Sequence, residues 1–72
     1  MIPDKSDPVW QKFISSAHDF QFNSLATRMM YTRVKQLLRS DGSKEEAISI
    51  AHTFFQSNEQ IAQADFEIVK NA

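Results

Sequence analysis

Two histidines, His18 and His52, carry the side-chain chemistry in this 72-residue chain that is best suited to acid–base catalysis or metal binding. Neither lies in a metal-binding spacing such as His-Glu-x-x-His. Ser15 and Ser16 precede His18, but closeness in sequence gives no nucleophile-and-base geometry without groups that stabilise an oxyanion. The chain has no Cys, which excludes disulfides and thiolate metal sites. The sequence therefore predicts no enzyme, no catalytic residue, no metal site and no cofactor.

A row of basic side chains could instead follow phosphate groups, because Arg28, Lys35 and Arg39 share one face of a predicted helix. Residues 24–44 carry five basic side chains and one acidic, whereas residues 45–72 carry one basic and five acidic. Adjacent helices of opposite charge attract each other, which accounts for this pattern without an external partner. Nucleic-acid binding through the three cations is therefore the alternative interpretation.

The last third of the chain has apolar residues at alternating four- and three-residue spacing, which is typical of helices that associate. Two polar residues fall on the same repeat, where a buried polar side chain fixes register and partner choice at some cost in stability. The residues predicted to contact a partner or a second copy are Phe54, Asn58, Ile61, Asp65 and Ile68.

Two alternatives to this interpretation remain open. Ser57 and Gln60 imitate a capping box, so the helix could break near Ser57 and a fourth helix could follow. In that case Asn58 and Asp65 would simply be solvated. A further hypothesis pairs Asp65 with Arg33, a charge that falls on the apolar flank of the preceding helix and would be costly if left bare.

Capping residues indicate where the helices that carry these side chains begin and end. Asp7 and Pro8 suit the start of a first helix, because Asp caps free amide groups and Pro lacks the N–H that would be unpaired there. Gly42 suits the left-handed residue that ends a helix, and Ser43 with Glu46 forms a capping box for the next one. The predicted helices are about 7–20, 24–40 and 44–70.

Apolar residues recur at three- and four-residue spacing in the first two helices as well, with Trp10 and Phe13 as the expected anchors of the first. The short connection around Gly42 makes the second and third helices antiparallel neighbours. We therefore expect one all-α domain over residues 1–72: a three-helix bundle built on an antiparallel hairpin with a long last helix.

A helix over 44–70 would be about 40 Å long and one over 24–40 about 25 Å, so the last helix would project beyond its neighbour. Its far end must then be covered by the first helix or by another chain. No stretch approaches the roughly 20 apolar residues that span a membrane, and the N-terminus has no secretory pattern, so we expect a cytoplasmic location. The expected function is a small non-catalytic protein-interaction module, an adaptor, inhibitor or regulatory subunit, that acts as a homodimer.

Overall fold

The computed structural model describes residues 1–16, 19–40 and 42–72, and this part of the chain is all-helical, with four helices and no strand. The helices are α1 (Pro8–Ser15), α2 (Leu25–Ser40), α3 (Lys44–Ser57) and α4 (Glu59–Lys70). The all-α class expected from the sequence is observed, with four helices in place of three. Ala17 and His18 of the predicted first helix, and Asp41 of the predicted turn, lie outside the described residues.

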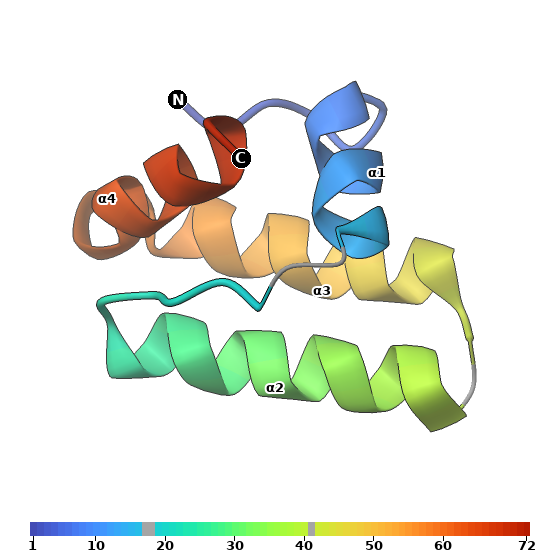
Figure 1. Cartoon of the computed structure of the whole chain (residues 1–72). Helices are drawn as coiled ribbons and strands as arrows, with labels where there is room; N and C mark the ends of the chain where they lie inside the picture. Colours follow the sequence, from blue (N-terminus) through green and yellow to red (C-terminus); the bar gives the residue numbers. More distant parts are fainter. Residues whose placement is uncertain (17–18, 41) are drawn as a thin grey trace.

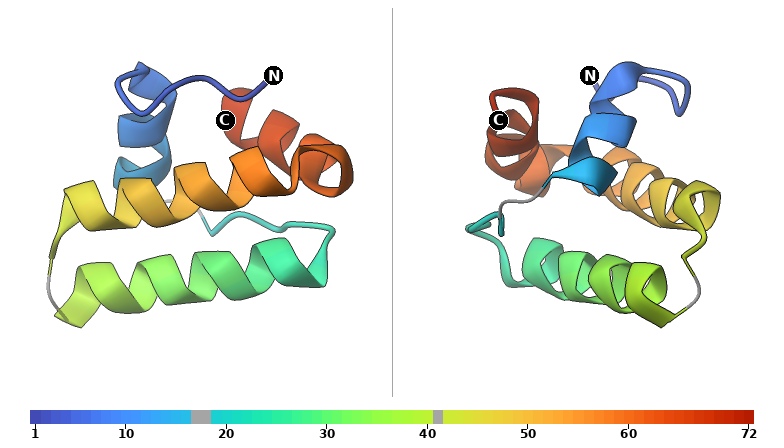
Figure 2. Two further views of the ribbon diagram at one scale, coloured as in Figure 1. Left: turned by 180° about the vertical axis from the view of Figure 1, so that it is seen from behind. Right: turned by 45° about the vertical axis from the view of Figure 1, so that its right-hand side comes forward.

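Helix α3 lies at the centre of the molecule and contacts each of the other three helices. α2 runs antiparallel along one side of it, while α1 and α4 lie on the other side (Figure 1). Two further views show the same order, with α3 between α2 and the α1–α4 pair (Figure 2). The central helix therefore has to be apolar over a wide arc, and its residues Ala47, Ala51 and Phe55 are fully buried.

Helix α1 begins where its sequence predicts and ends earlier. The N–H of Val9 donates to the Asp7 carboxylate at 2.9 Å, which caps the helix. Ser16 already has extended backbone angles (φ −64°, ψ 133°), so the prediction of a helix to about residue 20 is wrong. Residues 19–22 are non-helical, and in this form both Phe20 and Phe22 pack against the same ring of α2.

The turn between α2 and α3 uses local signals. Gly42 has a φ of 73°, and its N–H donates to the Leu37 carbonyl at 3.1 Å, which closes the end of α2. The N–H of Glu46 then donates to the Ser43 hydroxyl at 3.3 Å, which caps α3. These two bonds reverse the chain with few residues, since each satisfies a backbone group that a helix end would leave unpaired.

Helix α3 ends at Ser57, so the prediction of one helix over 44–70 is wrong and the alternative break is the one observed. Asn58 leaves the helical region (φ −122°, ψ 31°), and its side-chain amide donates to the Phe54 carbonyl at 2.8 Å. The Asn58 N–H donates to the same carbonyl at 3.0 Å, and Ala62 N–H donates to the Asn58 carbonyl. The chain thus changes direction at one residue, as Asn side chains that bond to nearby backbone favour.

The change of direction has a packing consequence, because it turns the apolar face of α4 onto the rest of the chain. Phe66 and Val69 are 2% and 0% exposed. The Phe66 ring lies 5.7 Å from Trp10 and 5.4 Å from Phe55 between ring centroids. Burying a side chain such as Phe66 contributes about 1.5–3 kcal/mol, which a straight helix projecting into water would forgo.

Trp10 anchors the chain's N-terminal segment as well as the core. Its side chain is 0% exposed, and its indole N–H donates to the Asp4 carbonyl at 2.8 Å. A second aromatic group surrounds Tyr31, whose ring centroid lies 5.5 Å from Phe13, 5.6 Å from Phe20 and 5.3 Å from Phe22. The two groups hold α1 against α3 and α4 on one side, and against α2 on the other.

Candidate functional site

The residues with acid–base or metal-binding chemistry do not converge in the part of the chain that the structure describes. His52 is partly buried, and its ring lies edge-on to Trp10 at 5.6 Å. His18 lies outside the described residues. Within those residues, no group of three or more His, Asp or Glu side chains is placed to hold a metal ion. The described contacts of His52 are those of a packing residue at the edge of the core.

Asp65 lies inside the molecule and binds the backbone at the start of α2. Its side chain is 1% exposed. Its carboxylate oxygens accept hydrogen bonds from the Asn23 N–H at 2.6 Å and the Ser24 N–H at 3.1 Å. A carboxylate at a helix N-terminus satisfies free N–H groups and interacts favourably with the helix dipole. Asp65 thus acts as a cap for α2 supplied by α4.

The hypothesis that Arg33 pairs with Asp65 is wrong, because the carboxylate is occupied by backbone N–H groups. Arg33 is exposed and lies on the flank of α2 that faces α3. Long basic side chains commonly lay their aliphatic part on apolar surface and keep the charged end in water, which removes the expected cost of this charge.

The other four residues predicted for the partner surface are placed in different surroundings. Ile61 is 66% exposed, whereas Ile68 is partly buried against the core. Phe54 is partly buried between α2 and α3, and Asn58 forms the break between α3 and α4. With Asp65 facing inward, the five residues are not one continuous surface. The break at Asn58 changes the direction of the second half of the repeat, and partner contact by these five residues stays a prediction.

The predicted basic face of α2 is partly engaged within the chain. The Lys35 ammonium lies 3.4 Å from the Asp19 carboxylate and 4.6 Å from the centroid of the Tyr31 ring. Arg28 and Arg39 are exposed. Two of the three predicted phosphate contacts therefore remain accessible, and the middle one is already neutralised.

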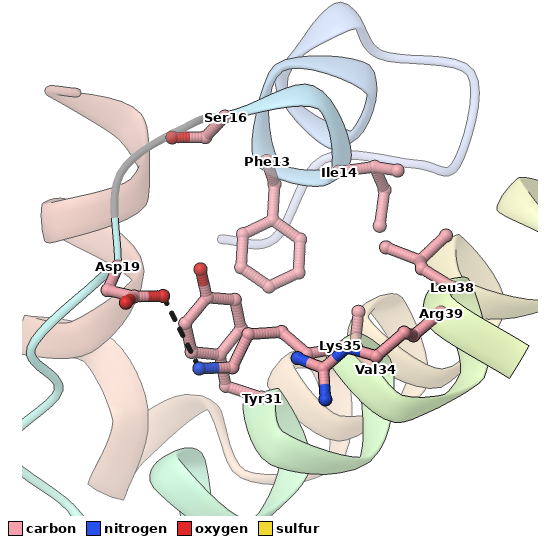
Figure 3. Close-up of a pocket in the computed structure, with 9 residues that line it drawn as sticks. All are labelled: Phe13, Ile14, Ser16, Asp19, Tyr31, Val34, Lys35, Leu38 and Arg39. Atoms are coloured by element: carbon pink, nitrogen blue, oxygen red, sulfur yellow. Dashed lines mark hydrogen bonds and ion pairs between the residues drawn. The ribbon is translucent and has the colours of Figure 1, made fainter.

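Lys35 and Arg39 also border a small pocket of about 310 Å³ between α1 and α2 (Figure 3). Phe13 of α1 points into it towards Tyr31 of α2, and the Lys35–Asp19 ion pair crosses its edge (Figure 3). The pocket offers apolar contact beside positive charge, but its lysine already has a carboxylate and an aromatic ring as partners.

A larger groove of about 410 Å³ lies between α2 and α3, and sequence reasoning missed it. Met30, Ile50 and Phe54 supply its apolar lining, while Arg33 from α2 and Glu46 from α3 border it on opposite sides. Met30 is nearly buried, and Ile50 and Phe54 are partly buried. The groove lies on the flank of α2 away from Tyr31 and hence away from the 19–22 segment, because residues 30 and 31 point about 100° apart on a helix.

Exposed apolar side chains precede Arg33, which borders the groove, on the same face of α2. Leu25 and Met29 are each 64% exposed, and they precede Arg33 by two turns and one turn on the same helix face. We call Leu25, Met29 and Arg33 the outer ridge of α2. The i, i+4, i+8 spacing of these residues is visible in the sequence, but which flank of α2 stays exposed depends on where α3 lies. Large apolar side chains grouped beside a groove are typical of interaction surfaces.

Comparisons with protein-family models, with curated proteins and with solved structures find no match to this chain. Among the helices described, none is both long and apolar enough to cross a lipid bilayer. The described residues form a small four-helix domain with an apolar groove between α2 and α3 and exposed apolar side chains on α2.

Proposed function

We propose that this chain is a small, non-catalytic protein-interaction module that forms a homodimer through the α2–α3 groove and the outer ridge of α2. The observation that carries the proposal is the exposure of Leu25 and Met29 beside that groove, both 64% exposed on one helix face. Covering such side chains on association removes apolar surface from water at about 25 cal/mol per Å². Of the five residues that the sequence pattern predicted for the contact, Phe54 lines this groove, whereas Ile61, Asp65 and Ile68 lie on α4.

Sedimentation equilibrium over a range of concentration, comparing the parent with Met29→Glu, tests this proposal. We expect a parent dimer and a variant that is monomeric at the same concentrations, because the new charge would lie in the apolar contact. Substitution at so exposed a position should leave the free energy of unfolding within about 0.5 kcal/mol. A circular dichroism melt checks that the variant is folded.

Ile61→Asp is the matched control, since Ile61 is exposed to the same extent (66%) but lies on α4. It should leave the dimer intact. A dimer that dissociates with Ile61→Asp and persists with Met29→Glu would move the interface to α4. A parent that stays monomeric at every concentration would refute self-association.

Nucleic-acid binding is the second candidate, favoured by the four basic and no acidic side chains of α2. It requires an affinity for duplex or single-stranded DNA or RNA that falls steeply with salt and weakens with Arg28→Ala and Arg39→Ala. The Lys35–Asp19 ion pair weighs against it, because it leaves one fewer cation for phosphate contacts.

A further inference from the structure

We infer that the two copies are related by a two-fold axis parallel to α2 and α3, so that α2 of each copy lies against α3 of the other. This inference rests on the proposed self-association and specifies its geometry. Its central contact is an ion pair between Arg33 of one copy and Glu46 of the second copy, formed twice in the dimer.

The antiparallel arrangement of α2 and α3 places Arg33 of one copy on the same side of the dimer groove as Glu46 of the second copy. The two helices lie side by side (Figures 1 and 2). A two-fold axis along the groove exchanges the sides on which α2 and α3 lie but keeps each residue at its own level along the axis. Arg33 and Glu46 border the same groove from opposite helices. Arg33 lies seven residues before the end of α2 and Glu46 two residues after the start of α3, so their levels differ by about five residues, or about 7 Å. The long side chain of Arg33 has to cover this offset to reach Glu46 of the second copy.

Charge selects this axis over the one perpendicular to the helices. A perpendicular axis would place α2 against α2, and this helix carries four basic and no acidic side chains. The first turn of α3 carries Glu45 and Glu46. Pairing α2 with α3 thus opposes unlike charges, whereas pairing α2 with itself brings like charges together, which disfavours the complex.

The two charges are available for such a contact. Among the ion pairs and side-chain hydrogen bonds within residues 1–16, 19–40 and 42–72, none involves the Arg33 guanidinium or the Glu46 carboxylate. Lys35, by contrast, has Asp19 as its partner. A stable interface buries about 800 Å² per partner, roughly one-sixth of this chain's surface of 4695 Å². The groove and the outer ridge are the apolar part of that area.

Mixing two charge-reversed variants tests the axis. In a homodimer of Arg33→Glu both contacts join two acidic side chains, and in a homodimer of Glu46→Arg both join two basic side chains. We therefore expect each variant alone to dimerise about tenfold more weakly than the parent. When the two variants are mixed, both contacts join opposite charges. Native mass spectrometry should then show the heterodimer in clear excess over the about one-half expected for random exchange.

Two variants outside the groove control for net charge. Lys44→Glu makes the same charge change as Arg33→Glu, and Glu45→Arg matches Glu46→Arg in both charge and position in the first turn of α3. Neither residue 44 nor residue 45 lines the groove. A mixture of these two variants should exchange at random. An excess of their heterodimer would show that overall charge, rather than the Arg33–Glu46 contact, directs pairing, and would overturn the inference.

The remaining outcomes separate this inference from the proposed function. Random exchange between Arg33→Glu and Glu46→Arg, in a protein whose parent is a dimer that Met29→Glu dissociates, would overturn the axis and leave the dimer surface standing. The double variant Arg33→Glu, Glu46→Arg decides between the two axes. With the parallel axis it should pair with itself rather than with the parent, because both of its contacts again join opposite charges. An excess of its heterodimer with the parent would establish the perpendicular axis instead. A monomeric parent would overturn both proposals together.

Discussion

The N-termini of α2 and α3 are capped in two different ways. At α3, the Ser43 hydroxyl accepts a hydrogen bond from the N–H of Glu46, three residues along the chain. At α2, the Asp65 carboxylate accepts hydrogen bonds from Asn23 and Ser24, which lie 42 and 41 residues away. The first cap is local and partly exposed, whereas the second is buried and joins α4 to α2.

The two caps differ in how much they depend on the rest of the fold. A local cap can form as soon as the chain turns at Ser43, because few backbone angles have to be fixed to bring its atoms together. The cap from Asp65 exists only when the chain has changed direction at Asn58 and α4 has packed. Its loss should therefore weaken tertiary structure, while the loss of the Ser43 cap should affect one helix end.

Asp65→Ala should have the largest effect, lowering the free energy of unfolding by about 3 kcal/mol. The reason is that two N–H groups lose charged acceptors and a buried cavity remains. That loss is large against a total of about 4–11 kcal/mol for a 72-residue domain. Urea unfolding followed by circular dichroism measures it.

Asp65→Asn separates charge from shape at the same site. The amide keeps the size of the side chain but has one acceptor oxygen and places an NH₂ donor near the second N–H. We expect a loss of about 2 kcal/mol. If Asp65→Ala lowered the free energy of unfolding by no more than the loss of a local cap does, the cap from α4 would contribute no more stability than a local one.

Ser43→Ala should lower the free energy of unfolding by about 1 kcal/mol, as is usual for loss of an N-cap side chain. The same urea titration measures it, with Ser43→Asp as the control that keeps an acceptor at the cap. Because the two caps are far apart, the losses from Ser43→Ala and Asp65→Ala should add in the double variant. A marked departure from additivity would show that the local cap also depends on how α4 packs.

Thr27→Val should raise the free energy of unfolding by about 0.5–1 kcal/mol. Thr27 is 0% exposed in the first turn of α2, and its hydroxyl has no hydrogen-bond partner among the described residues. Valine keeps the shape and removes a buried polar group that has lost its water. Thr32→Val is the control, since that hydroxyl donates to the Arg28 carbonyl at 3.0 Å and is exposed. A destabilised Thr27→Val variant would indicate that the hydroxyl has an unseen partner.

The smallest effect concerns Asp4, whose pKa is lowered by hydrogen bonds from the Ser6 hydroxyl and the Ser6 N–H, with a smaller contribution from His52. Ser6→Ala should raise the pKa of Asp4 towards its usual value of 3.8, because the hydroxyl bond is lost. A carboxyl NMR titration measures the shift, and Ser6→Thr should preserve the low pKa.

The sign of the associated stability change follows from the direction of that shift. A group whose pKa is lowered on folding contributes stability above its unfolded pKa, and this contribution is lost as the pH falls through the folded value. Asp4 is fully exposed, so this pH dependence should be weak and confined to strongly acidic solution. An unchanged pKa in Ser6→Ala would assign the shift to the Ser6 N–H alone.

Sequence reasoning was most successful where the signal was local. The predicted starts at Asp7–Pro8 and Ser43 correspond to caps in the structure, and the predicted helix over 24–40 corresponds to α2 at Leu25–Ser40. Each start depends on a side chain bonding to backbone within three residues. The all-α class follows from the same signals and from the three- and four-residue apolar spacing.

Sequence reasoning failed where two apolar patterns were equally consistent with the residues. The heptad from Ala47 to Ile68 fits a straight helix, whereas after the turn at Asn58 helix α4 buries Ala62, Phe66 and Val69 and leaves Ile61 exposed. Choosing between a straight helix and a break requires knowing that Trp10 and Phe55 lie where their rings can contact Phe66. The α2–α3 groove was missed for a similar reason, because the flank of α2 that stays exposed depends on where α3 lies.

The amino-acid sequence by itself determined where most helices begin, which faces are apolar and how charge divides between α2 and the acidic last third. Each of these depends on residues within a turn or two of one another. The tertiary structure alone decided that α4 turns back, that Asp65 caps α2 and that Arg33 and Glu46 border one groove. These three features depend on contacts between residues far apart in the sequence. Such contacts decide whether the apolar face of α4 is buried within the chain or exposed to water.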